Sequence, residues 1–105
     1  PFFGMASIGY IPRGQIVGLS KLARAVDFHS RALQNQERIT SHIEEAIAEA
    51  LDPEGIAVVL EARHLCMEMR GIRKAGAITT TSRMTGAFFD NPQTRAEFFK
   101  IIDRM

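Results

Sequence analysis

The sequence predicts a single α+β domain in which two helices cover one face of an antiparallel sheet. Three observations support this fold class. The chain has 105 residues, enough for one domain; it is 46% hydrophobic and 24% charged; and its predicted elements run strand, helix, helix, strand, strand, helix. We therefore expect residues 1–105 to form one domain. Only the last helix remains to cover the other face of the sheet, so we also expect self-association.

The first half of the chain predicts one strand and two helices. Residues 2–11 are rich in Phe, Ile and Tyr and stop at the turn sequence PRGQ, as strands do. Apolar residues at helical spacing predict a first helix with Ser20 as its N-cap. A second helix follows QNQ and ends at DPEG. Its apolar stripe is the clearest in the chain and consists of Ile39, Ile43, Ala46, Ile47, Ala50 and Leu51.

The second half predicts a hairpin and a closing helix. Residues 56–70 alternate as a long strand does, and GIRKAG connects them to a Thr-rich strand over residues 77–89. The closing helix begins with Asn91 as its cap and Pro92 at the first helical position, where Pro is favoured.

The stretch EARHLCMEMRG, residues 61–71, contains the only cysteine of the chain and one of its three histidines. Alternate residues of a strand share a face, so His64, Cys66 and Arg70 continue the face that carries Ile56, Val58, Leu60 and Ala62. Neighbours on one face lie about 6.6 Å apart, so the imidazole and the thiol can line one pocket. Both groups bind zinc, and His also transfers protons near neutral pH.

These residues alone do not complete a metal site. Zinc needs three or four protein ligands, and the other histidines, His29 and His42, fall in the predicted helices. A lone Cys or His in a strand is also common as an ordinary buried residue. From the residues alone both interpretations stay open.

Two further segments carry candidate binding groups. GLSKLAR places Ser20, Lys21 and Arg24 in the first turns of a helix, which is either an anion pocket or a solvated basic face. QNQERIT places Gln36 and Glu37 at the start of the second helix. There they either complement the helix dipole or bind the donor edge of a guanine.

Charge and cysteine content exclude several functional classes. Thirteen basic and twelve acidic residues leave a net charge of +1, which gives no general attraction to nucleic acids or to an anionic membrane. Apolar runs such as IAVVL are far shorter than the roughly 20 residues that span a bilayer. One cysteine cannot form an intrachain disulfide, so we expect a cytoplasmic protein.

Three motifs, GLSKLAR, QER and HLCMEMRG, occur here in an order and at separations that resemble a known enzyme family. Over essentially all 105 residues the sequence closely resembles the catalytic domain of GTP cyclohydrolase I, of the tunnelling-fold superfamily. The resemblance implies a four-stranded antiparallel sheet with two helices packed on one face. It also implies zinc-dependent hydrolytic opening of the GTP imidazole ring at C8, release of formate, and reclosure to 7,8-dihydroneopterin triphosphate.

The resemblance also implies roles for individual residues. Cys66 matches a zinc ligand and His64 matches a catalytic acid/base group. Gln36 and Glu37 match the pair at the guanine, and the triphosphate would be held by Ser20, Lys21, Arg24 and Arg70, some of them across subunit boundaries. GTP would be the substrate. The subunits would join edge to edge as a homo-oligomer, a decamer of two stacked pentameric rings.

The sequence departs from the family pattern at its start. In the family a Cys-Glu-His-His segment just before the strand matching PFFG supplies the other zinc ligands and a second catalytic His. This sequence begins at Pro1 and has no second cysteine. We therefore interpret it either as a piece of the full enzyme or as a truncated form without normal activity.

Two other functions remain as alternatives. One is a non-catalytic tunnelling-fold module that binds nucleotide or supports assembly without a complete zinc site. The other is a reductase or synthase of the same superfamily, against which GLSKLAR together with the H-x-C motif favours the cyclohydrolase.

Overall fold

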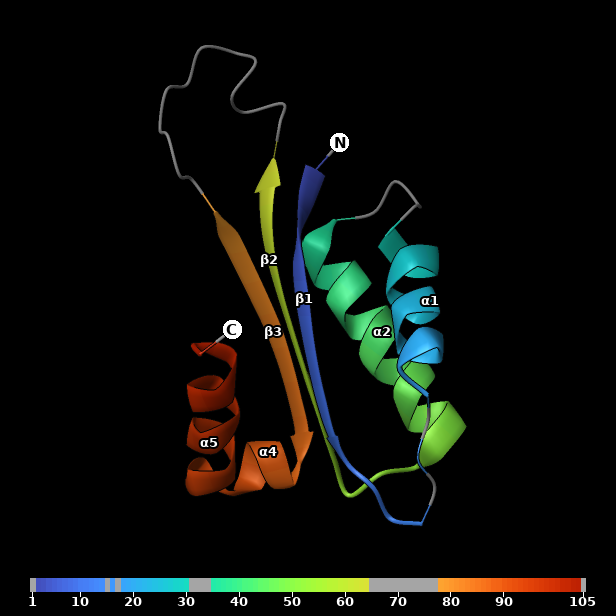
Figure 1. The fold of residues 1–105 in the computed structure, drawn as a ribbon, viewed down its shortest axis with the longest axis vertical. Coiled ribbons are helices and arrows are strands. Elements are labelled where there is room, and N and C mark those ends of the chain that lie inside the picture. The colour runs from blue at the N-terminus through green and yellow to red at the C-terminus, as the bar shows by residue number, and fades with distance from the viewer. Residues whose placement is uncertain (1, 15, 17, 31–34, 65–77, 105) are drawn as a thin grey trace.

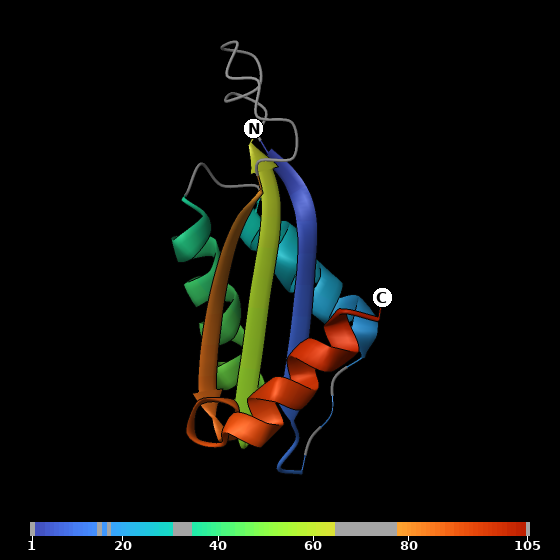
Figure 2. The ribbon, with the colours of Figure 1, turned by 90° about the vertical axis from the view of Figure 1, so that its left-hand side faces the viewer.

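The chain forms one antiparallel sheet with helices on both of its faces (Figures 1 and 2). The computed structural model describes residues 2–14, 16, 18–30, 35–64 and 78–104. Its elements are β1 (Phe2–Ile11), α1 (Leu19–Ser30), α2 (Gln36–Leu51), β2 (Gly55–His64), β3 (Thr79–Gly86), α4 (Ala87–Asp90) and α5 (Pro92–Ile102). The predicted α+β class is confirmed. The sheet has three strands within this part of the chain, so the fourth strand implied by the resemblance is not among the described residues.

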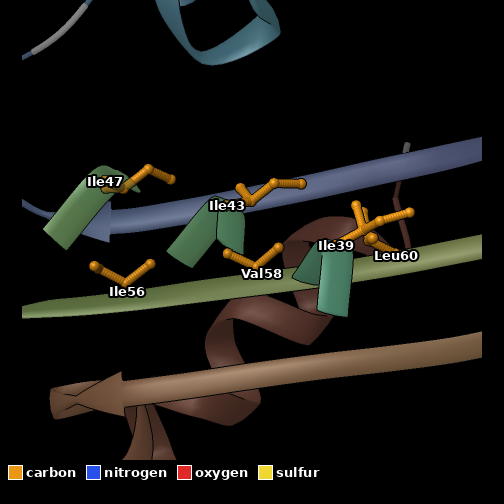
Figure 3. Close-up of a cluster of buried hydrophobic side chains, with 6 residues drawn as sticks. All are labelled: Ile39, Ile43, Ile47, Ile56, Val58 and Leu60. Carbon is orange, nitrogen blue, oxygen red and sulfur yellow. The ribbon is translucent and has the colours of Figure 1, made fainter. Parts of the chain in front are cut away.

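The core lies between α2 and the central strand β2. Three isoleucines of α2 face three apolar residues of β2, and all six side chains are at most 6% exposed (Figure 3): Ile39, Ile43, Ile47, Ile56, Val58 and Leu60. Fully burying one such side chain is worth about 1.5–3 kcal/mol. The predicted strand face is confirmed as one side of this interface, and the predicted helical stripe is confirmed at its three isoleucines, whereas Ala50 is exposed.

Strand register decides which side chains share this face. In β1 and β2, Ala6 is opposite Leu60, and in β2 and β3, Thr81 is opposite Leu60. Residues directly opposite each other in a sheet point to the same side. The face of β3 that looks toward α2 is consequently polar throughout, and it consists of Thr79, Thr81, Arg83 and Thr85.

The opposite face of the sheet is covered by α4 and α5 near the Gly55 end of β2 (Figure 2). The Phe88 and Phe98 rings meet edge to face, with their centroids 5.5 Å apart. They lie against Gly9 of β1, where an added Cβ would come within 2.7 Å of the Phe98 ring. The closing helix thus buries part of the face that we expected self-association to cover.

The predicted end of the third strand is wrong by three residues. We expected a strand through Phe89, but Ala87–Asp90 form the short helix α4. The strand stops because Gly86 has φ +58°, and any side chain there would run into the backbone of Glu54. The N–H of Ala87 then donates to the Glu54 carbonyl at 3.1 Å.

Helix ends agree with the predictions at most positions. The Asn91 side chain accepts hydrogen bonds from the N–H groups of Gln93 and Thr94, and Pro92 opens α5, as predicted. The prediction that Ser20 caps α1 is wrong, because the helix already includes Leu19 and the Lys21 N–H donates to the Gly18 carbonyl. The strand predicted for residues 56–70 is confirmed through His64. Its remainder and the GIRKAG turn lie outside the described residues.

Candidate functional site

The candidate site lies at the end of the sheet where α2 begins and β2 ends (Figure 1). The first turn of α2 is capped by Asn35, whose side-chain oxygen accepts the Arg38 N–H at 2.8 Å. At this end of the sheet β2 runs out to His64 and β3 starts at Thr79. The element that carries the QER motif and the strand that ends at His64 therefore meet at one end of the sheet.

Gln36 ties α2 to both neighbouring strands at this end. Its Nε2 donates to the carbonyl oxygen of Leu60 at 3.0 Å and to that of Thr79 at 2.8 Å, and it lies 3.3 Å from Thr81 Oγ1. The residue is 5% exposed. A buried amide held by two backbone carbonyls fixes the helix relative to the strands.

Glu37 follows directly and is exposed to solvent. A carboxylate in the first turn of a helix is stabilised by the N-terminal end of the helix dipole. As a pair of hydrogen-bond acceptors beside the sheet end, it has the chemistry to bind a ligand edge that presents N–H donors. The structure therefore gives the two residues of the QE pair different surroundings, one buried and one accessible.

The other predicted residues of the strand are described only in part. The backbone of His64 pairs with Phe2 at the last position of β2, and the predicted alternation is confirmed as far as Ala62, which is 3% exposed. The predictions for Cys66 and Arg70 lie outside the described residues, as does the side chain of His64.

The basic residues of GLSKLAR are not brought to the QE pair within one chain. Ser20, Lys21 and Arg24 are exposed on the first turns of α1. Helices α1 and α2 are antiparallel, so the first turn of α1 lies away from the first turn of α2 (Figure 1). A helix of 12 residues is about 18 Å long. These side chains thus form a separate basic surface.

No metal site is formed by the residues that the structure describes. Within that part of the chain, no group of three or more His, Cys, Asp and Glu side chains is close enough to hold an ion. The described residues therefore do not fit zinc without further ligands. None of the described helices has the length and apolar character of a membrane span.

A separate apolar groove of about 680 Å³ runs along the outer edge of β1, between α1 and α5. The exposed Met5 is on its rim, as is Ile101, and its other lining residues are mostly small or aliphatic: Ala6, Ser7, Ile8, Leu22, Ala23, Val26, Asp27, Phe98 and Ile102. This lining offers few polar groups, so it suits packing better than catalysis.

Comparison with known proteins identifies the family. The family model described as GTP cyclohydrolase I matches residues 1–103. This chain belongs to that family. It is 58% identical over 104 residues to a protein of Chlorobium chlorochromatii named GTP cyclohydrolase 1, covering 99% of this chain and 47% of that protein. Proteins of the same name from Corynebacterium glutamicum and Methylococcus capsulatus are 57% and 51% identical, with 53% and 56% of their lengths covered.

The chain spans about half the length of these curated GTP cyclohydrolase 1 relatives. The matched region contains every residue for which the sequence predicted a role, from Ser20 to Arg70. Membership of the GTP cyclohydrolase I family is thus established for the whole of the described fold. The roles of single residues remain predictions.

Sequence reasoning missed two hydroxyl groups that complete the surroundings of Gln36. Thr40 Oγ1 donates to the Gln36 carbonyl at 2.8 Å and lies 2.7 Å from Thr81 Oγ1. The sequence did contain a signal for this cluster. Gln36 and Thr40 are four residues apart on a helix and so share one side of it, and the strand register places Thr81 on the same face of the sheet as Leu60. Apolar periodicity alone does not indicate such a polar cluster.

Proposed function

We propose that this chain is the core of a GTP cyclohydrolase that opens the imidazole ring of GTP at C8, releases formate and forms 7,8-dihydroneopterin triphosphate. The observation that carries the proposal is the position of Glu37, which is exposed beside the sheet end where β2 reaches His64. Gln36, the residue before Glu37, donates to the Leu60 carbonyl. Leu60 is four positions before His64 in β2. That separation corresponds to about 13 Å of strand, a span that a purine nucleotide can bridge.

In this proposal Glu37 binds the guanine. Its two carboxylate oxygens accept hydrogen bonds from the N1–H and the 2-amino group of the base, two neighbouring donors that no other common purine presents together. His64 moves a proton to or from the opening ring, which is a typical task for an imidazole near neutral pH. Both residues lie at the same end of one subunit.

The triphosphate is assigned to Ser20, Lys21, Arg24 and Arg70. Because the first three lie on a surface remote from Glu37 in the same chain, we propose that they serve a nucleotide held mainly by a neighbouring subunit. Two cations and a hydroxyl on the first turns of a helix complement a polyanion.

Assembly is part of the same proposal. The outer strands β1 and β3 each leave one edge without a neighbour among the described residues, and the apolar groove follows the β1 edge. We propose that neighbouring subunits pair edge to edge, with four strands in each complete subunit and two pentameric rings in the particle. Light scattering in solution measures the mass and so tests the number of subunits.

Zinc is proposed as the cofactor, with Cys66 as one ligand and the others supplied by residues that the structure does not describe. When bound, zinc would supply a Lewis acid for the hydrolysis. We expect Cys66→Ser to lower the zinc content of the full-length protein, measured by metal analysis, together with its formate release. A variant that keeps one zinc per chain would contradict the assignment.

The direct test is turnover. The full-length protein, incubated with GTP and zinc, is expected to release formate and to give a fluorescent pterin after oxidation. Glu37→Ala is expected to weaken GTP binding roughly 10- to 100-fold, the range for a lost hydrogen bond to a charged group. Glu45→Ala, an exposed acid on the same helix, is the matched control and should bind GTP normally. Absence of formate from the wild-type protein would refute the catalytic proposal.

A second candidate function is a nucleotide-binding or assembly module without catalysis. It is favoured by the single cysteine of the given sequence, which supplies at most one thiolate ligand for zinc. It predicts GTP binding without formate, and less than one zinc per several chains. Stoichiometric zinc would count against it.

A further inference from the structure

The contact between α2 and β3 contains a buried polar cluster formed by Gln36, Thr40 and Thr81. Gln36 and Thr40 are 5% and 2% exposed, and Thr81 is half-buried. Three hydrogen-bond contacts of 2.7–3.3 Å connect the Gln36 amide nitrogen, its backbone carbonyl and the two hydroxyls. The cluster joins the first turn of the helix to the beginning of β3.

The orientation of the Gln36 amide follows from its partners. The carbonyl oxygens of Leu60 and Thr79 only accept, so the group that faces them is the NH₂ and not the side-chain oxygen. An NH₂ has two hydrogens, enough for these two backbone acceptors, and Thr81 Oγ1 is a longer contact of the same nitrogen at 3.3 Å. The Gln36 nitrogen therefore donates to both β2 and β3 and links the two strands at this point.

The two hydroxyls extend these contacts between α2 and the sheet by one turn along the helix. Thr40, one turn after Gln36, bonds to the Gln36 carbonyl and contacts Thr81, the residue opposite Leu60 in the sheet. Apolar packing of the neighbouring isoleucines binds the helix to the sheet but is non-directional. Hydrogen bonds depend on angle and distance, so the polar cluster fixes how the first turn is rotated over the sheet.

We propose that Gln36, Thr40 and Thr81 are positioning residues for Glu37. They fix the backbone of the first turn of α2, so that the Glu37 carboxylate meets the N1–H and the 2-amino group of a guanine at the sheet end. This inference rests on the proposed function, since it presumes that Glu37 binds the base. It gives Gln36 a role through its neighbour and not through contact with the nucleotide.

The test measures base discrimination in the full-length protein. Dissociation constants are determined for GTP and for inosine triphosphate, which lacks the 2-amino group, so their ratio reports how well Glu37 is aligned. Thr81→Val and Thr40→Val keep the side-chain shape and remove the hydroxyl. We expect each to reduce the preference for GTP by about tenfold, the effect of about one hydrogen bond. Thr81→Ser restores the hydroxyl and should restore the preference.

Thr80→Val is the matched control, because Thr80 is an exposed residue of β3 on the other face of the sheet. It should leave the ratio unchanged. Equal loss of affinity for both nucleotides in Thr81→Val and Thr40→Val would overturn the inference, since it indicates a stabilising role alone. So would an unchanged ratio in these variants combined with a collapsed ratio in Gln36→Ala, which would place Gln36 at the base. If wild type does not bind GTP, the proposed function itself fails.

Discussion

Helix α2 carries two stripes that face the same sheet with opposite chemistry. One consists of Ile39, Ile43 and Ile47 and packs on the apolar residues of β2. The other consists of Gln36, Thr40 and Glu44, and it meets the polar inner face of β3 through hydrogen bonds and one ion pair. Both stripes repeat every four residues, so each keeps to one side of the helix.

The difference between the stripes separates two physical tasks. Apolar burial supplies free energy in proportion to area and tolerates small shifts, whereas buried polar groups contribute little net stability but penalise any displacement that leaves them without a partner. An enzyme site needs both kinds of contact, because its fold must be stable and its functional groups must be held in fixed positions. On this view the isoleucine stripe keeps the domain folded, and the polar stripe fixes the end of the helix that bears Glu37.

The largest expected effect is in the apolar stripe. Ile43 is 0% exposed and lies at the centre of the core cluster, so Ile43→Ala is expected to lower the free energy of unfolding by about 3 kcal/mol through lost burial and a residual cavity. Urea denaturation of the chain measures this value. Ile43→Val, which removes one methyl group, should cost about 1 kcal/mol. Equal losses for the two variants would mean that the site collapses around the smaller side chain.

An intermediate effect is expected for the amide of the polar stripe. Gln36→Ala removes the donor from the Leu60 and Thr79 carbonyls and the 3.3 Å contact with Thr81 Oγ1, so it is expected to lower the free energy of unfolding by about 2 kcal/mol. The matched control is Gln93→Ala on α5, where the side chain is exposed and the change should stay within about 0.5 kcal/mol. A Gln36→Ala protein as stable as wild type would show that water satisfies the carbonyls.

The same two stripes explain how far the sequence predicted the fold. The spacing of apolar residues directly indicates whether a segment is a helix or a strand, which is why β1, α2 and the inner face of β2 were predicted correctly. The cap of α5 was also evident, because Asn91 and Pro92 signal a helix start by local chemistry alone. The strand prediction was wrong at Ala87–Phe89, because two aromatic residues after a strand favour its continuation. The turn there depends on the contact of Gly86 with Glu54, 32 residues earlier in the chain.

The candidate site was less predictable than the fold. The resemblance assigned Gln36 and Glu37 to the same guanine site, yet Gln36 is buried and Glu37 is exposed. Which of the two is buried depends on the strand that packs against the helix, and the sequence does not indicate that strand. Thr40 and Thr81 are ordinary residues in the sequence, and only the pairing of Thr81 with Leu60 brings them together. Ser20 and Lys21 were expected to bind an anion, but their distance from the QE pair follows from the antiparallel helices and no sequence pattern reveals it.

The smallest expected effect concerns the ion pair at the end of the polar stripe. Arg83 Nε lies 3.7 Å from Glu44 Oε2, which is too long for a strong charge-assisted hydrogen bond, and the arginine side chain is 47% exposed. Exposed pairs are worth about 0–1 kcal/mol, while loss of a partner costs more when the remaining charge is buried, and the Glu44 side chain is only 9% exposed. We therefore expect Arg83→Gln to cost about 1 kcal/mol, near the top of the exposed range.

A double-mutant cycle decides whether that cost is electrostatic. In the background of Glu44→Gln, which keeps the shape but removes the charge, Arg83→Gln should cost close to nothing, and in wild type the cost should shrink in 1 M salt because exposed charges are screened. The loss in Ile43→Ala should not shrink in the same way. If Arg83→Gln costs the same in both backgrounds, the aliphatic part of the arginine contributes by packing. The inner face of β3 would then stabilise the fold by the same means as β2, and the division between the two stripes would hold only at the Gln36 end.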